Sequence, residues 1–214
     1  MKRSQRVASD DKPHSADAFG LERLVFFSDA VFAIAITLLV LDIRLPETEG
    51  LLTDGQLRDA LVGLGHQYLA YILSFLVIGV FWIGHHRRYR FIHRYDGMLL
   101  FLNLLLLMIV AFVPFPSALI SRYPSVTATI FYAGVMVAAG IVSLLIWGYA
   151  SYNHRLIDPA LSPQVIRREY LTLLATPLVF LTSIGIALID PELAKLAWIL
   201  IAPTRLLLRG GHEG

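Results

Sequence analysis

The chain has 214 residues, of which 57% are hydrophobic and only 16% are charged. A soluble domain carries about 25% charged residues, so this composition excludes a soluble protein and indicates an integral membrane protein. At about 20 residues per crossing, the length allows six or seven helical spans and leaves no room for a separate soluble catalytic domain. The chain has no cysteine, which excludes disulfides, thiolate metal sites and a cysteine nucleophile.

Four of the predicted spans follow from the intervals between charged residues. A transmembrane helix needs about 18 or more apolar residues. Four intervals without Asp, Glu, Lys or Arg exceed that length, namely residues 60–86, 97–121, 123–154 and 170–189. We therefore expect a membrane-spanning helix in each interval.

Two further spans require charged residues near or inside the membrane. Residues 30–41 form an apolar run between Asp29 and Asp42, and this run crosses the membrane only if Asp29 lies within it. Residues 193–208 cross only if Lys195 and Arg205 extend to the lipid headgroups. With both included, we predict an all-α integral membrane protein with six transmembrane helices.

The distribution of basic residues predicts the orientation of the spans. With six spans, 14 of the 18 Lys and Arg residues fall on one side, and the other side carries Arg44, Arg58, Arg122 and Lys195. The positive-inside rule then places both termini in the cytoplasm, and we expect a multi-pass protein of the cell membrane. Five or seven spans would lose this asymmetry.

The two ends of the chain differ from the apolar centre. Residues 1–20 are polar and lack the apolar core of a signal peptide, so we expect a disordered cytoplasmic tail there. Residues 21–209 then form one six-helix domain, and residues 210–214 form a C-terminal tail.

The first span has one apolar stripe and a separate polar pair. On a helical wheel of about 100° per residue, the stripe covers an arc of about 60° and contains Phe27, Ile34, Leu38 and Leu41. Asp29 lies about 140° from Ile34 on the same wheel. A charged side chain costs about 2.5–3.5 kcal/mol at the centre of a membrane helix, so Asp29 is expected to face the helix bundle.

Two interpretations of this stripe remain open at this point. In the first, the stripe faces lipid and the polar residues hydrogen-bond to neighbouring helices. In the second, several chains place their stripes around a symmetry axis, where rings of Ile34, Leu38 and Leu41 form a hydrophobic constriction that gates by dewetting.

The polar residues do not indicate a metal site or an enzyme. His85, His86 and His93 lie in a basic run whose spacing matches no metal-binding motif, so we predict no metal and no cofactor. Ser28 and Asp29 are adjacent and therefore about 100° apart on a helix, which is a poor arrangement for a nucleophile and its base.

The stretch Arg23-Leu24-Val25-Phe26-Phe27-Ser28-Asp29 fits the pattern R-x-x-x-F-S-D, and Thr37 follows Asp29 by eight positions. In the second span, Trp82 and His85 form W-x-x-H. Asp96, Asn103 and Pro114 follow at 14, 21 and 32 residues after Trp82. In this ordered set the chain resembles the transmembrane protein 175 family of potassium channels, over roughly its N-terminal half.

The resemblance implies a bacterial-type member in which four chains surround a central pore lined by the first helix. It implies that Ile34 sets the pore constriction, that Leu38 and Leu41 form further apolar rings, and that Thr37 contributes to ion selectivity. It also implies a network of hydrogen bonds that holds the pore helix, formed by Arg23, Phe27, Ser28, Asp29, Trp82, His85, Asp96 and Asn103.

The predicted function is a homotetrameric, moderately selective potassium channel embedded in the lipid bilayer, with the potassium ion as its permeant species. Selectivity is expected to be modest because the chain has no T-V-G-Y-G filter sequence. The alternative is a proton-coupled secondary transporter that uses Asp29, His85 and Asp96 as an intramembrane relay, since ionisable groups in membranes often serve transport. We expect no nucleic-acid partner.

Overall fold

The computed structural model describes residues 12–47 and 50–199, and helices account for most of them. In chain order they are α1 (Lys12–Leu38), the short η1 (Leu39–Asp42), α2 (Asp54–Gly63), α3 (Gly65–Tyr89), α4 (Gly97–Phe112), α5 (Pro114–Arg122), α6 (Val126–Ser151), the short η2 (Tyr152–His154), α7 (Pro163–Ala187) and α8 (Pro191–Ile199).

Five of the six predicted spans are confirmed as helical segments long and apolar enough to cross a membrane. Their bounds are Phe19–Asp42, Gly65–Tyr89, Gly97–Arg122, Val126–His154 and Pro163–Ala187. A helix satisfies its backbone hydrogen bonds internally, which is why apolar intervals of this length fold in this way in lipid.

The sixth predicted span, residues 193–208, is described only in its first part. α8 covers Pro191–Ile199, and the rest of that span and the C-terminal tail lie outside the described residues. The sixth crossing therefore stays a prediction.

The expected disordered tail of residues 1–20 is wrong for its second half. α1 begins at Lys12, so residues 12–20 are helical, whereas residues 1–11 lie outside the described part of the chain. Pro13 falls in the first turn, where a missing backbone N–H costs nothing. Ala16 and Ala18 then favour continuation of the helix.

The third span is interrupted in its middle. α4 ends at Phe112 and α5 begins at Pro114, with Val113 between them. Val113 keeps helical dihedral angles, with φ −54° and ψ −36°. The break falls here because Pro114 lacks the N–H that would continue the hydrogen-bond ladder. Pro177, by contrast, lies inside the continuous helix α7.

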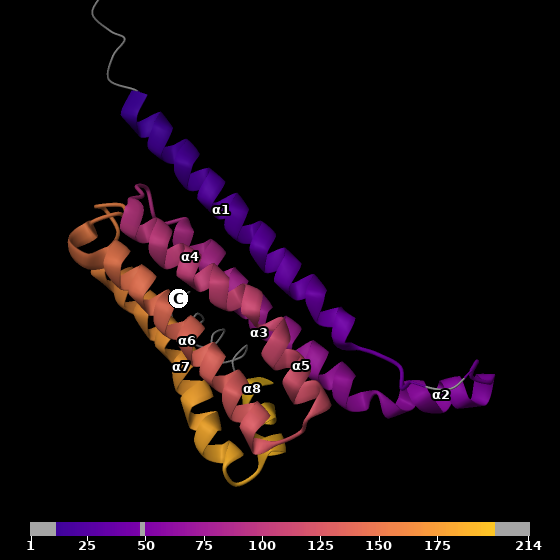
Figure 1. Ribbon diagram of the computed structural model, residues 1–214. Helices are drawn as coiled ribbons and strands as arrows, with labels where there is room; N and C mark the ends of the chain where they lie inside the picture. Colours follow the sequence, from indigo (N-terminus) through magenta and orange to yellow (C-terminus); the bar gives the residue numbers. More distant parts are fainter. Residues whose placement is uncertain (1–11, 48–49, 200–214) are drawn as a thin grey trace, which may run out of the picture.

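The helices form a bundle in which α1 lies along one side (Figure 1). α1 packs against α3 and α4, α4 also packs against α6, and α6 pairs with α7. α2 projects from the end of the bundle and buries none of its residues. The other described helices therefore cover only one face of α1.

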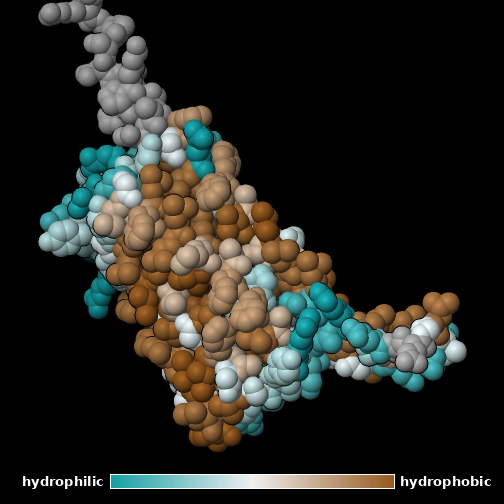
Figure 2. Space-filling model, viewed as in Figure 1, coloured by the Kyte–Doolittle hydropathy of each residue, from teal (hydrophilic) through white to brown (hydrophobic). Residues whose placement is uncertain are grey.

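The face of the bundle seen in Figure 2 is largely hydrophobic, and hydrophilic residues gather at its upper end and near the segment that projects at the lower right. The loops that follow α3 and α6 meet at one end, where the N–H of His93 donates to the carbonyl of Leu156 over 2.9 Å. This end carries most of the arginines, as the span order predicts. Its location on the cytoplasmic side stays a prediction.

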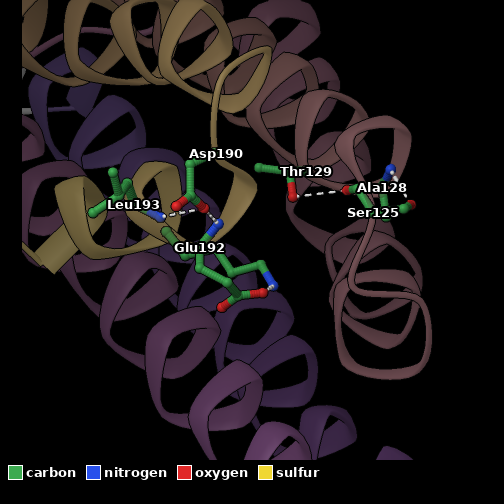
Figure 3. A network of polar contacts seen from close by, with 7 residues as sticks. Ser125, Ala128, Thr129, Asp190, Glu192 and Leu193 are labelled. Atoms are coloured by element: carbon green, nitrogen blue, oxygen red, sulfur yellow. Dashed lines mark hydrogen bonds and ion pairs between the residues drawn. The ribbon is translucent and has the colours of Figure 1, made fainter.

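At the opposite end, side chains cap the first turns of α6 and α8 (Figure 3). Ser125 Oγ accepts from the N–H of Ala128 over 3.3 Å, and Asp190 Oδ1 accepts from the N–H of Glu192 over 2.8 Å. Lys195, which we expected to extend to the headgroups, is buried and donates to Glu192 Oε1 over 2.7 Å. A neighbouring carboxylate one turn away stabilises the ammonium without that extension.

Candidate pore helix and its anchoring network

The apolar stripe lies on the uncovered face of α1 and continues to Leu41 in η1. The side chains of Ile34, Leu38 and Leu41 are 58%, 41% and 60% exposed. Phe32 and Ala35, on the other face, are each only 1% exposed because they pack into the bundle. A single chain thus presents the stripe outward, ready to contact either lipid or other copies of the chain.

Thr37 is exposed beside this stripe. Its hydroxyl donates to the carbonyl oxygen of Ile34 over 2.9 Å. This hydrogen bond within the helix orients the hydroxyl and leaves the lone pairs of its oxygen on the uncovered face.

A buried cluster of four polar side chains joins the opposite face of α1 to α3 and α4. Asn103 Nδ2 donates to Ser28 Oγ over 3.0 Å, and Ser28 Oγ in turn donates to the carbonyl of Leu24 over 2.8 Å. Asn103 Oδ1 lies 2.9 Å from both His85 Nε2 and the hydroxyl of Tyr89. We call Ser28, His85, Tyr89 and Asn103 the anchor cluster.

The direction of these hydrogen bonds determines the tautomer of His85. Because Asn103 donates through its nitrogen to Ser28, its oxygen must accept from both Tyr89 and His85. His85 therefore carries its proton on Nε2, and its Nδ1 has no hydrogen-bond partner among the described residues. The ring stacks on Tyr89 with centroids 4.2 Å apart, which fixes its plane.

Asp29 makes a second connection between α1 and α3. Its Oδ1 accepts from Trp82 Nε1 over 2.8 Å. This contact turns the carboxylate away from the apolar stripe, as the helical wheel predicts, because Trp82 lies on the covered side of α1.

Three of the expected network residues lie outside these contacts. Arg23 and Phe27 are exposed on α1, and Arg23 lies over the ring of Phe19 at 5.9 Å from its centroid. Asp96 caps α4, accepting from the N–H of Leu99 over 2.9 Å. The structure thus brings together Ser28, His85 and Asn103, and separately Asp29 and Trp82.

Asp96 belongs to a separate group at the arginine-rich end. Its Oδ2 accepts from the hydroxyl of Tyr149 over 2.6 Å and lies 3.7 Å from Arg155 Nε. Burial raises the pKa of Asp96, but the hydrogen bonds from Tyr149 and Leu99 and the charge of Arg155 outweigh it, so the pKa lies below its usual value. Asp96 therefore stays ionised at neutral pH.

Two tyrosines complete these groups and were missed in the sequence. Tyr89 follows His85 by four residues, a spacing that puts both side chains on one face of α3; this signal could have revealed it. Tyr149 lies 53 residues from Asp96, and no local pattern connects the two.

Comparisons with known proteins identify the family of this chain. A family model described as the endosomal/lysosomal potassium channel TMEM175 matches residues 23–114. A potassium channel from Streptomyces collinus is 38% identical over 185 residues, which cover 84% of this chain and 88% of the relative. This chain belongs to the TMEM175 family.

Structural and more distant relatives extend this result. The crystal structure of a lysosomal potassium-selective channel TMEM175 homolog from Chamaesiphon minutus matches with a TM-score of 0.77 at 32% identity, over 90% of this chain and 99% of that chain. The human endosomal/lysosomal proton channel TMEM175 is 31% identical over 152 residues, covering 70% of this chain and 29% of the human one. The TMEM175 family consists of ion channels, so this member is not an enzyme.

Proposed function

We propose that this TMEM175 protein is a moderately selective potassium channel formed by four identical chains, with α1 of each chain lining a central pore. In this arrangement the chain crosses the cell membrane six times, the last time through residues 193–208, and has both termini in the cytoplasm. The relatives named as potassium channels support the choice of ion.

The observation that best supports a pore lined by α1 is that this helix has two different faces. One face is attached to the bundle through the anchor cluster and the Asp29–Trp82 hydrogen bond. The other leaves Ile34, Leu38 and Leu41 uncovered. Four such helices around an axis would bury these side chains as stacked apolar rings, which close a pore by expelling water from it.

We further propose that Thr37 contacts permeant ions. Its hydroxyl oxygen retains lone pairs on the exposed face, next to Ile34 and Leu38. One ring of hydroxyl oxygens replaces less of the hydration shell of an ion than the successive carbonyl rings of a filter loop, so the expected preference for potassium over sodium is modest.

The transporter alternative has less support from the geometry. Among the described residues, no hydrogen bond joins Asp29, His85 and Asp96 to one another. Asp29 is bonded to Trp82, His85 to Asn103 and Asp96 to Tyr149. A proton relay needs a continuous series of hydrogen bonds, and each of these three residues is hydrogen-bonded to a different partner.

The test is ion flux from liposomes containing the purified protein, measured with potassium, sodium and proton gradients. An Ile34→Asn substitution should raise potassium flux several-fold, because a polar ring hydrates the constriction. Ile141→Asn is the matched control, since Ile141 is similarly exposed, at 47%, but lies on α6. It should leave flux unchanged.

The same measurements can reject the proposal. A wild-type protein that passes no potassium is not this channel. Wild-type flux in Ile34→Asn together with loss of flux in Asp29→Asn would favour the transporter. Chemical cross-linking in detergent that stops at dimers would exclude a four-chain pore.

A further inference from the structure

The last turn of α3 is held from two opposite sides. On one side, His85 and Tyr89 both hydrogen-bond to Asn103 of α4. On the other, Arg87 Nη2 lies 2.7 Å from Glu169 Oε2 of α7. Arg87 is two residues from both His85 and Tyr89, which is about 200° around the helix.

The ion pair is largely shielded from water. The side chains of Arg87 and Glu169 are 20% and 6% exposed. Arg88, the next residue of α3, is 3% exposed, and its Nη1 has no hydrogen-bond partner within the described part of the chain. The charge of Glu169 also attracts Arg88, so one buried carboxylate balances two guanidinium groups.

These contacts form a continuous path from α7 to the pore helix. Glu169 of α7 forms an ion pair with Arg87 of α3. In the same turn of α3, His85 and Tyr89 hydrogen-bond to Asn103 of α4. Asn103 in turn donates a hydrogen bond to Ser28 of α1. A sideways shift of this turn of α3 toward one partner lengthens the contacts with the partner on the opposite side. The path thus connects a carboxylate of α7 to α1 through α3 and α4.

We infer that Arg87 and Glu169 are positioning residues for the pore, which couple α7 to the gate-lining face of α1 through the last turn of α3. The inference rests on the proposed channel function. Loss of the pair frees this turn of α3, and the anchor cluster then no longer holds the four α1 helices at one distance from the axis. The apolar rings close further, and potassium flux falls.

Glu169→Gln and Arg87→Gln should not have equal effects. Removal of Glu169 leaves two neighbouring guanidinium groups buried without a counter-charge, whereas removal of Arg87 leaves Glu169 free to balance Arg88. In the liposome assay we expect potassium flux to fall at least fivefold in Glu169→Gln and less in Arg87→Gln. Arg87→Lys keeps the charge and should stay within twofold of wild type.

Arg90→Gln is the matched control, because Arg90 follows α3 directly but is exposed. It should leave the flux unchanged. Equal flux in wild type, Glu169→Gln and Arg87→Gln would overturn the inference. So would an Arg87→Lys variant that loses as much flux as Arg87→Gln, because the preserved charge would then have no effect.

A second measurement follows the position of the pore helix itself. The chain has no cysteine, so an Ile34→Cys substitution introduces a unique thiol, whose modification rate by a water-soluble thiosulfonate reports access to the pore. Adding Glu169→Gln should change this rate at least threefold, and adding Arg90→Gln should not. An unchanged rate in a correctly assembled Glu169→Gln protein rejects the coupling.

The two hypotheses fail in different ways. A wild-type protein that passes no potassium refutes the proposed function. A conducting wild type with unaffected Arg87 and Glu169 variants refutes only the coupling. If the Glu169→Gln protein does not assemble, Arg87→Gln is the variant that tests the coupling. In that variant Glu169 and Arg88 remain and balance each other's charge.

Discussion

Asn103 offers the sharpest test of the anchor cluster through an Asn103→Leu substitution. Its side chain is fully buried and makes three hydrogen bonds to residues of α1 and α3. Leucine has the same branched arrangement of four heavy atoms in its side chain, so the core stays filled. The change leaves the Nε2–H of His85 and the hydroxyl of Tyr89 buried without an acceptor.

The expected loss follows from the number of unpaired groups. Two buried donors without partners cost about 1–3 kcal/mol each, which gives about 2–6 kcal/mol. Interhelical hydrogen bonds in membrane proteins average about 0.6 kcal/mol each when measured pairwise, so three of them set a lower bound of about 2 kcal/mol. The predicted decrease in the free energy of unfolding is therefore about 2–6 kcal/mol.

The assay is reversible unfolding in mixed detergent micelles, followed by circular dichroism. Ser28→Ala and Ser143→Ala form a matched pair of controls, because both serines are buried and donate to a carbonyl four residues earlier. Only Ser28 also accepts from Asn103, so only Ser28→Ala should destabilise, by about 1–3 kcal/mol. An Asn103→Leu protein within 1 kcal/mol of wild type, or equal effects of the two serine changes, would refute the reasoning.

Two further predictions concern helix packing and pH. A Cβ atom on Gly140 would lie 2.9 Å from Cδ of Pro177, so Gly140→Ala should separate α6 from α7 and lower the free energy of unfolding by about 1–3 kcal/mol. Gly134 lies on the same helix with open space around it, so Gly134→Ala should raise the free energy of unfolding by about 0.5–1 kcal/mol. Unfolding curves that rank the two variants alike would contradict this. The pKa of Asp96 is lowered on folding, so its stabilising contribution is full above the ordinary carboxyl pKa and is lost as pH falls through the lowered value. Tyr149→Phe should raise the folded pKa of Asp96 and reduce the stability gained as pH rises from the lowered pKa to the ordinary carboxyl pKa. The measurement is the apparent melting temperature at acidic pH, and an unchanged pH profile would show that the hydrogen bond has no such effect.

The sequence alone predicted the parts of the fold that depend on one segment at a time. Apolar length specifies a span because lipid offers the backbone no hydrogen-bond partners, and five such helices are present. Residues 12–20 were predicted wrongly because their polarity suggested disorder, whereas helix propensity and a proline in the first turn extend α1 to Lys12. Ser28, His85 and Asn103 were expected to form one network only because the family resemblance implies it.

The tertiary structure decided which polar groups meet. Asp96 pairs with Tyr149 of α6 rather than with the other motif residues, and Arg87 pairs with Glu169 of α7. Charge counting had assigned Arg87 only to one side of the membrane. Asp96 and Tyr149 are 53 residues apart in the chain, and Arg87 and Glu169 are 82 residues apart. Only the packing of α3, α4, α6 and α7 brings the members of each pair within hydrogen-bond distance. The periodicity of α1 defined an apolar stripe, but the bundle determined that this stripe stays uncovered, because the polar contacts of Ser28 and Asp29 draw the opposite face of the helix inward.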